Sequence, residues 1–183
     1  MNHIFLTAIL TMTGFGASAL GCTKDRSTSN QPARDAPTVG AAPPAAVSTE
    51  SPPSNQAHFD PKRDSQLDLE RAITVARQSN KRILLDVGGD WCPWCHILDE
   101  FVTQEPSIRE YLAAHYVVVR VNYSDENPNE AFLSRYPKIT GYPHLFVLDQ
   151  DGRLLHSQDT SVLESGRSYN TEAFGAFLRK WTQ

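Results

Sequence analysis

Apolar and polar positions follow two regular periods along most of the chain, and a long front part follows neither. Some segments place apolar residues every three or four positions, which is typical of amphipathic helices, whereas others gather β-branched residues in short runs. Helices that alternate with strands before a terminal hairpin indicate an α/β fold, with a central mixed β-sheet flanked by helices on both faces. The pattern predicts helices over 65–79, 93–103, 106–115, 130–136 and 174–181, and strands over 82–87, 116–122, 144–148 and 153–157.

Local signals mark the ends of several elements. Ser65 followed by Asp68 resembles a capping box at the start of the first helix, and Asn80 and Lys81 end that helix. The Asp-Gly pair at 151–152 predicts a hairpin turn between the last two strands.

The start of the chain predicts export. Residues 4–20 carry no charge and small residues precede Cys22, which is the order of a secretory signal over residues 1–21. The ending Ala-Leu-Gly-Cys resembles the bacterial lipoprotein box, which implies that Cys22 carries lipid and anchors the chain to a membrane. A simple signal peptide or an uncleaved anchor is the alternative, although the run is short for a membrane span. In each case we expect the bacterial periplasm or cell envelope.

Residues 22–59 are rich in Pro, Ala, Ser and Thr and nearly lack apolar periodicity. Such a segment buries too little surface to offset the entropy of ordering it. We interpret it as a disordered tether that leads to one domain over residues 60–183. The formal net charge of −4 comes without a basic patch, which argues against a nucleic-acid partner.

The candidate chemistry lies in residues 84–96, which read LLDVGGDWCPWCH. Pro93 suits the first turn of a helix, so we expect Cys92 at a helix N-terminus. Backbone N–H groups and the helix dipole favour a thiolate there, and the thiolate is the nucleophile in disulfide exchange. Cys95, one turn on, can then attack Cys92 and close a disulfide. If Cys22 carries lipid, no other cysteine remains, and the pair is a candidate two-electron redox centre.

Over about residues 60–183 the chain resembles the thioredoxin superfamily. Three features carry the resemblance: a WCxxC after the first strand, Asp86 six residues before its first cysteine, and Gly-Tyr-Pro at 141–143 before the terminal hairpin. The chain is similar in particular to the periplasmic C-terminal domain of the DsbD electron transporters, which also starts with a helix and reads DWCxxC.

The resemblance implies a role for each residue of the redox centre. Cys92 would be the attacking nucleophile and Cys95 the resolving thiol, with a structural disulfide as the alternative. Asp86 would be a buried carboxylate that relays a proton to or from Cys95 through water, because burial raises its pKa towards that of a thiol. Its alternative is an ordinary polar residue at a strand end.

The resemblance also implies a substrate-binding surface. Pro143 would be a cis-proline facing the disulfide, which leaves the Tyr142 backbone able to pair with a substrate strand. Trp91 and Trp94 would form an apolar docking surface beside Cys92, although either could belong partly to the core.

The chain departs from the thioredoxin pattern at several of these positions. Gly88 and Gly89 stand where thioredoxin has a bulky and a small residue, and His144 stands where a Thr is usual. The dipeptide Pro93-Trp94 matches neither the Gly-Pro of reducing thioredoxins nor the Pro-His of the strongly oxidising periplasmic enzyme.

These observations predict a membrane-tethered thiol:disulfide oxidoreductase without a cofactor. Its substrates would be protein thiols or disulfides, and a membrane or periplasmic partner would exchange electrons with it. Oxidising power requires extra stabilisation of the thiolate, and Pro93 and Trp94 offer little. We therefore expect the reducing or isomerising direction, with net disulfide formation as the alternative.

Other functions fit parts of the same motif. CPWCH is also the CxxCH pattern of c-type haem attachment, with His96 as the proximal ligand. A copper-handling protein could use both cysteines and a distant histidine such as His144. A redox-inactive binding module is a further alternative.

Overall fold

The computed structural model describes residues 59–182, and they form five α-helices, a short 3₁₀ helix and six strands. The elements are α1 (Ser65–Ser79), β1 (Arg82–Gly88), α2 (Pro93–Gln104), α3 (Pro106–His115), β2 (Tyr116–Asn122), α4 (Glu130–Leu133), β3 (His144–Leu148), β4 (Leu154–Asp159), η2 (Thr160–Leu163), β5 (Glu164–Ser165), β6 (Ser168–Tyr169) and α5 (Thr171–Trp181).

The main sheet has four strands in the order β2-β1-β3-β4. Strands β1 and β2 are parallel, whereas β1–β3 and β3–β4 are antiparallel, so the predicted mixed sheet is confirmed. In the register of this sheet, Asp86 of β1 lies opposite Arg120 of β2 and Leu145 of β3. This register brings a carboxylate and a guanidinium together at the centre of the fold.

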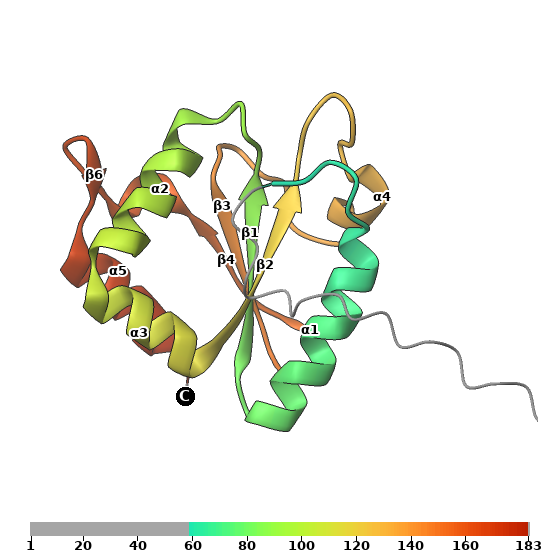
Figure 1. The fold of residues 1–183 in the computed structure, drawn as a ribbon, viewed down its shortest axis with the longest axis horizontal. Helices are drawn as coiled ribbons and strands as arrows, with labels where there is room; N and C mark the ends of the chain where they lie inside the picture. Colours follow the sequence, from blue (N-terminus) through green and yellow to red (C-terminus); the bar gives the residue numbers. More distant parts are fainter. Residues whose placement is uncertain (1–58, 183) are drawn as a thin grey trace, which may run out of the picture. The chain divides into compact units, whose positions relative to one another are not determined.

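Helices cover both faces of the sheet, with α1 and α4 on one side and α2, α3 and α5 on the other (Figure 1). The side chains of β1 point alternately to the two faces of the sheet, as successive side chains of a strand do. Ile83, Leu85 and Val87 pack in the core on the α1 side, and Leu84 packs on the other. The same alternation places Asp86 on the face covered by α2.

The predicted helices and strands are confirmed, with small differences at their ends. The helix expected over 130–136 ends at Leu133. The last strand begins at Leu154 rather than at 153. The sequence pattern did not predict η2 or the hairpin of β5 and β6, because strands of two residues carry no periodicity.

The capping box expected at Ser65 is wrong. Asp64 caps α1 instead, since its carboxylate accepts hydrogen bonds from the backbone N–H groups of Gln66 and Leu67. The side chain of Asp68 is buried and accepts a hydrogen bond from Arg63 Nε at 2.7 Å. Asp68 therefore stabilises the turn before the helix through an ion pair.

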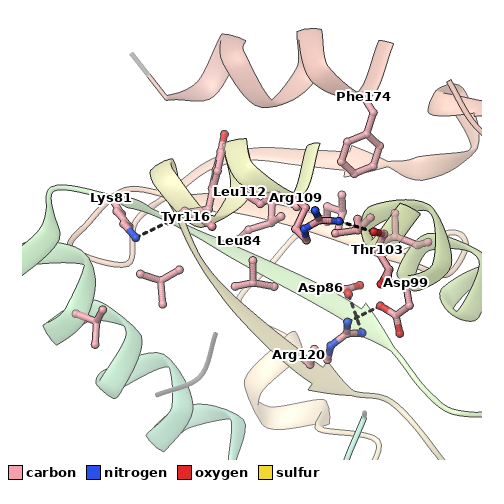
Figure 2. Close-up of a pocket in the computed structure, with 17 residues that line it drawn as sticks. Lys81, Leu84, Asp86, Asp99, Thr103, Arg109, Leu112, Tyr116, Arg120 and Phe174 are labelled. Carbon is pink, nitrogen blue, oxygen red and sulfur yellow. Dashed lines mark hydrogen bonds and ion pairs between the residues drawn. The ribbon is translucent and has the colours of Figure 1, made fainter. Parts of the chain in front are cut away.

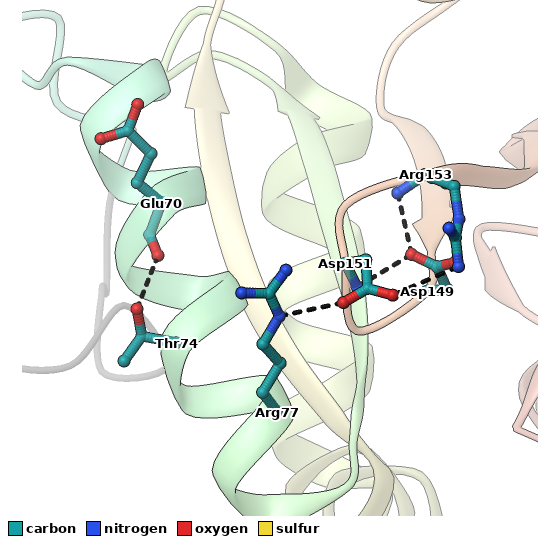
Figure 3. Close-up of polar contacts among 6 residues, drawn as sticks. All are labelled: Glu70, Thr74, Arg77, Asp149, Asp151 and Arg153. Carbon is teal, nitrogen blue, oxygen red and sulfur yellow. Dashed lines mark hydrogen bonds and ion pairs between the residues drawn. The ribbon is translucent and has the colours of Figure 1, made fainter.

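The predicted turn between β3 and β4 forms around Asp149. Its Oδ1 accepts hydrogen bonds from the backbone N–H groups of Asp151 and Arg153, each at 2.9 Å. Arg77 of α1 donates to Asp151 at 2.9 Å, so the turn is joined to the first helix (Figure 3). Gly152 takes the positive φ of 82° that this turn requires.

The predicted signal over residues 1–21, the lipidated Cys22 and the tether up to residue 58 lie outside the described residues. Phe59, which the sequence pattern assigned to the tether, is buried in the domain. Within residues 59–182, no helix is long and apolar enough to cross a bilayer.

Candidate redox site

Cys92 and Cys95 form a disulfide at the N-terminus of α2, with Cα atoms 5.3 Å apart. Cys92 is the N-cap residue and Pro93 the first residue of the helix, as predicted from the sequence. The backbone N–H of Cys95 donates to Cys92 Sγ at 3.1 Å. The same N–H group, together with the positive end of the helix dipole, would stabilise a Cys92 thiolate once the disulfide is reduced.

The buried carboxylate predicted at Asp86 belongs to a three-residue ion-pair network. Arg120 of β2 lies between Asp86 and Asp99 of α2 and forms an ion pair with both (Figure 2). Its Nη1 is 3.4 Å from Asp86 Oδ2, and its Nη2 donates to Asp99. Asp86 Oδ1 is buried and has no hydrogen-bond partner among the described residues. One oxygen of the Asp86 carboxyl group is thus not occupied by the ion pair.

Burial raises the pKa of Asp86 from 3.8 to about 6, although the positive charge of Arg120 lowers it and the negative charge of Asp99 raises it further. A carboxyl group with this pKa changes its charge near neutral pH. It therefore suits a general acid and base for thiol chemistry.

Sequence reasoning missed Arg120 and Asp99. A signal for Asp99 was present, because it follows Cys95 by four positions and so shares its helix face. Arg120 is the one charged residue in the run YVVVRVN, but only the strand register shows that it meets Asp86.

We expect Arg120→Met to lower the free energy of unfolding at pH 8 by about 3 kcal/mol, since breaking a buried ion pair leaves buried charge uncompensated. At pH 5 the loss should be smaller, because Asp86 is then mostly protonated. Urea unfolding at both pH values measures this difference. Arg153→Met, which breaks the exposed pair with Asp149, is the control and should lower stability by much less than Arg120→Met does. Equal losses for Arg120→Met at both pH values would contradict the assignment.

An aromatic surface adjoins the disulfide. Trp91 is 54% exposed, and its Nε1 donates to the backbone oxygen of Tyr123 at 2.6 Å. Its ring forms a T-shaped contact with Tyr142, which stacks on Tyr123 with centroids 4.9 Å apart. Burial raises the pKa of Tyr142 to about 12, so its hydroxyl stays neutral at physiological pH. Tyr123 was not predicted to belong to this surface.

The second tryptophan lies differently. Trp94 is partly buried and packs against the core, where its ring forms a T-shaped contact with Tyr169. It also packs against the cysteine pair. The structure therefore places Trp94 at the boundary between the core and the redox site, which is the mixed role that the sequence left open.

The peptide bond between Tyr142 and Pro143 is cis, as the resemblance implied. The backbone oxygen of Pro143 accepts a hydrogen bond from the buried hydroxyl of Thr160 at 2.6 Å. His144, the departure from the usual Thr, is buried on β3, and its Nε2 lies 2.8 Å from the hydroxyl oxygen of Ser157. Burial lowers the pKa of His144.

The copper alternative gains no ligand set among the described residues, and the histidine of the haem-like motif contacts the backbone. The Nε2 atom of His96 donates to the backbone oxygen of Asp90 at 2.7 Å. In the part of the chain that the structure describes, no three His, Cys, Asp or Glu side chains are grouped to hold a metal ion.

Residues 64–150 match a family model described as thioredoxin-like. The chain is 28% identical over 93 residues to the disulfide bond reductase DsbH of Chlamydia pneumoniae, a match that covers 46% of this chain and 55% of that protein. It is 31% identical over 120 residues to the thiol:disulfide interchange protein DsbD of Pseudomonas fluorescens, covering 65% of this chain and 19% of that protein. The chain thus spans about half of the first relative and a fifth of the second.

A solved structure supports the same fold. The disulphide isomerase from Xylella fastidiosa Temecula1 superposes with a TM-score of 0.59 at 22% identity, covering 68% of this chain and 96% of that one. The predicted resemblance to thioredoxin-like and DsbD-type proteins is confirmed. This chain therefore carries a thioredoxin-like domain.

Proposed function

We propose that this protein is a thiol:disulfide oxidoreductase that acts on protein cysteines through Cys92 and Cys95. The observation that carries the proposal is the disulfide itself, formed at a helix N-terminus on the face of β1 that also holds the buried Asp86. Relatives named disulfide bond reductase and thiol:disulfide interchange protein support it.

In the reducing direction, the Cys92 thiolate attacks a substrate disulfide, and the departing substrate sulfur takes a proton. A mixed disulfide then joins Cys92 to the substrate. Cys95 passes its proton through water to Asp86, and its thiolate attacks Cys92. The Cys92–Cys95 bond forms as the mixed disulfide breaks, and the second substrate sulfur leaves as a thiolate that takes up the proton held by Asp86. Two electrons have moved from the protein to the substrate.

The direction of transfer rests on the residues between the cysteines. Pro93 has no N–H group and Trp94 turns towards the core, so the helix terminus supplies most of the stabilisation of a Cys92 thiolate. Moderate stabilisation of the Cys92 thiolate gives a reduction potential between the oxidising and reducing extremes. We therefore propose a reducing or isomerising role. The DsbH relative is named a reductase, which agrees with this direction.

Equilibration with glutathione tests the direction. We expect a potential of about −270 to −200 mV, between those of thioredoxin and the glutaredoxins. The reduced fraction at a series of glutathione ratios, followed by alkylation and mass, gives this value. A potential near about −120 mV would instead indicate net disulfide formation.

We further propose that Cys22 carries lipid and holds the domain in the periplasm. The lipoprotein-like sequence at residues 19–22 supports this proposal. An electron partner in the membrane or periplasm would keep the pair reduced. The intact mass of membrane-extracted protein tests the anchor, since a mature chain that starts after Cys22 or retains residues 1–21 would contradict it.

A further inference from the structure

Both cysteines are covered by a residue from outside the redox motif. Phe59, the first residue that the structure describes, is 3% exposed and packs directly on Cys92 and Cys95, each of which is 2% exposed. Trp94 and Tyr142 pack around the same cluster. The redox pair is therefore closed off by a side chain from the segment before α1.

The strand beside the disulfide makes room for this ring. A Cβ atom at Gly88 would lie 2.5 Å from Cys95 Sγ and 3.1 Å from Phe59 Cζ. The bulky residue that thioredoxin has at this position is absent here, and Phe59 and the disulfide share the space. The cover thus comes from a separate segment of chain rather than from the strand.

Phe59 also contacts the ion-pair network. The guanidinium carbon of Arg120 lies 5.2 Å from the centre of the Phe59 ring, within the range of a cation–π contact. Arg120 in turn pairs with Asp86. One ring therefore covers the two sulfurs and the cation that contacts the proton-exchanging carboxylate.

The backbone at Phe59 is held more weakly than the residues that follow it. The N–H of Phe59 donates to Asp90 Oδ1 at 3.4 Å, near the upper limit for a hydrogen bond. Two residues later the chain is fixed more firmly, since Asn127 Nδ2 donates to the backbone oxygen of Pro61 at 2.8 Å. The firmly held part of the chain therefore begins two residues after Phe59.

We propose that Phe59 is a lid on the redox pair, closed at rest and displaced when a reacting sulfur approaches Cys92. The lid deepens the proposed function, because the exchange requires an incoming thiolate to bond to Cys92 while the Cys92–Cys95 bond breaks and Cys95 leaves as a thiolate. With both cysteines buried, the lid limits how often that approach succeeds. It slows exchange in both directions without choosing between them.

The test compares Phe59→Ala with the wild type in the full chain. Burying a phenylalanine side chain favours the closed state by a factor of roughly ten to a hundred. We therefore expect reduction of the oxidised protein by dithiothreitol to become about tenfold faster or more. Reoxidation of the reduced protein by oxidised glutathione should accelerate as well, since a lid obstructs both reactions.

Phe132→Ala is the matched control. Phe132 of α4 is 6% exposed and packs in the core on the opposite face of the sheet. Its loss loosens the domain without opening the redox pair, so its exchange rates should stay near those of the wild type.

Three results would overturn the lid. They are unchanged rates in Phe59→Ala, an equal acceleration in Phe132→Ala, and an acceleration in one direction only, which would indicate a change in disulfide stability instead. Dithiothreitol and glutathione need no protein substrate, so the lid is tested even if the wild type fails to exchange disulfides with proteins. Such a failure would contradict the proposed function and not the lid.

Discussion

Cys95→Ser is expected to leave the protein covalently joined to its substrates. Cys92 remains at the helix N-terminus and can still attack a substrate disulfide, but no thiol is left one turn on to resolve the product. Mixed disulfides should accumulate, and catalytic turnover should fall to the uncatalysed level. Non-reducing gels followed by mass spectrometry of the trapped species would measure both the bond and the substrate.

Cys92→Ser is the matched control and should trap nothing, because Cys95 lies within the helix rather than at its N-cap, where backbone N–H groups favour a thiolate. In the reduced wild type, alkylation at neutral pH should modify Cys92 before Cys95. Faster labelling of Cys95, or mixed disulfides formed through Cys95 in the Cys92→Ser variant, would reverse the two roles.

The fold could be predicted because its elements are long enough to show their period. The run YVVVRVN and the helix of residues 65–79 show their period within their own residues, and both were predicted with the correct ends. The cap of α1 was misplaced by one residue because Asp64 and Ser65 can both accept hydrogen bonds from a helix start. Local patterns therefore predict that a helix or strand exists more reliably than they predict the residue at which it begins.

The redox pair could be predicted because the two cysteines and the proline that starts their helix lie within four consecutive residues. Its environment could not, because it depends on contacts between distant residues. Phe59 is a single apolar residue at the end of a polar segment, and its burial depends on the missing side chain at Gly88. Arg120 joins Asp86 only through the pairing of two strands. No periodicity in either segment reports such a contact.

Asp86→Asn should stabilise the domain and slow its chemistry. The pKa of Asp86 is raised from 3.8 to about 6 in the folded protein. A raised pKa means that the folded state holds the proton more tightly than the unfolded state. The stability that this proton contributes is complete below about pH 4 and is lost as the pH rises through 6. The loss amounts to about 3 kcal/mol, at 1.36 kcal/mol for each unit of pKa.

Asparagine is neutral at every pH and escapes this loss. We therefore expect wild type and Asp86→Asn to unfold alike near pH 4, and the variant to be more stable by up to about 3 kcal/mol at pH 8. Urea unfolding of the oxidised proteins at the two pH values measures the difference. Asp68→Asn is the control, since Asp68 is also buried but pairs with two arginines, Arg63 at 2.7 Å and Arg71, whereas Asp86 lies 3.4 Å from Arg120. Its loss should destabilise the domain at pH 8.

The same substitution should slow the resolving step, because an amide cannot take the proton of Cys95. A positioned general base contributes roughly 10² to 10⁴ in rate, so release of a preformed mixed disulfide at pH 7 should slow by about that factor. Stopped-flow release of a labelled peptide thiol measures this step alone. If Asp86→Asn is more stable but releases the peptide at the wild-type rate, Asp86 is not part of the proton relay. If release is slower but stability at pH 8 is unchanged, the raised pKa of Asp86 is contradicted. Only the two effects together fit a carboxylate that the fold keeps buried for its chemistry.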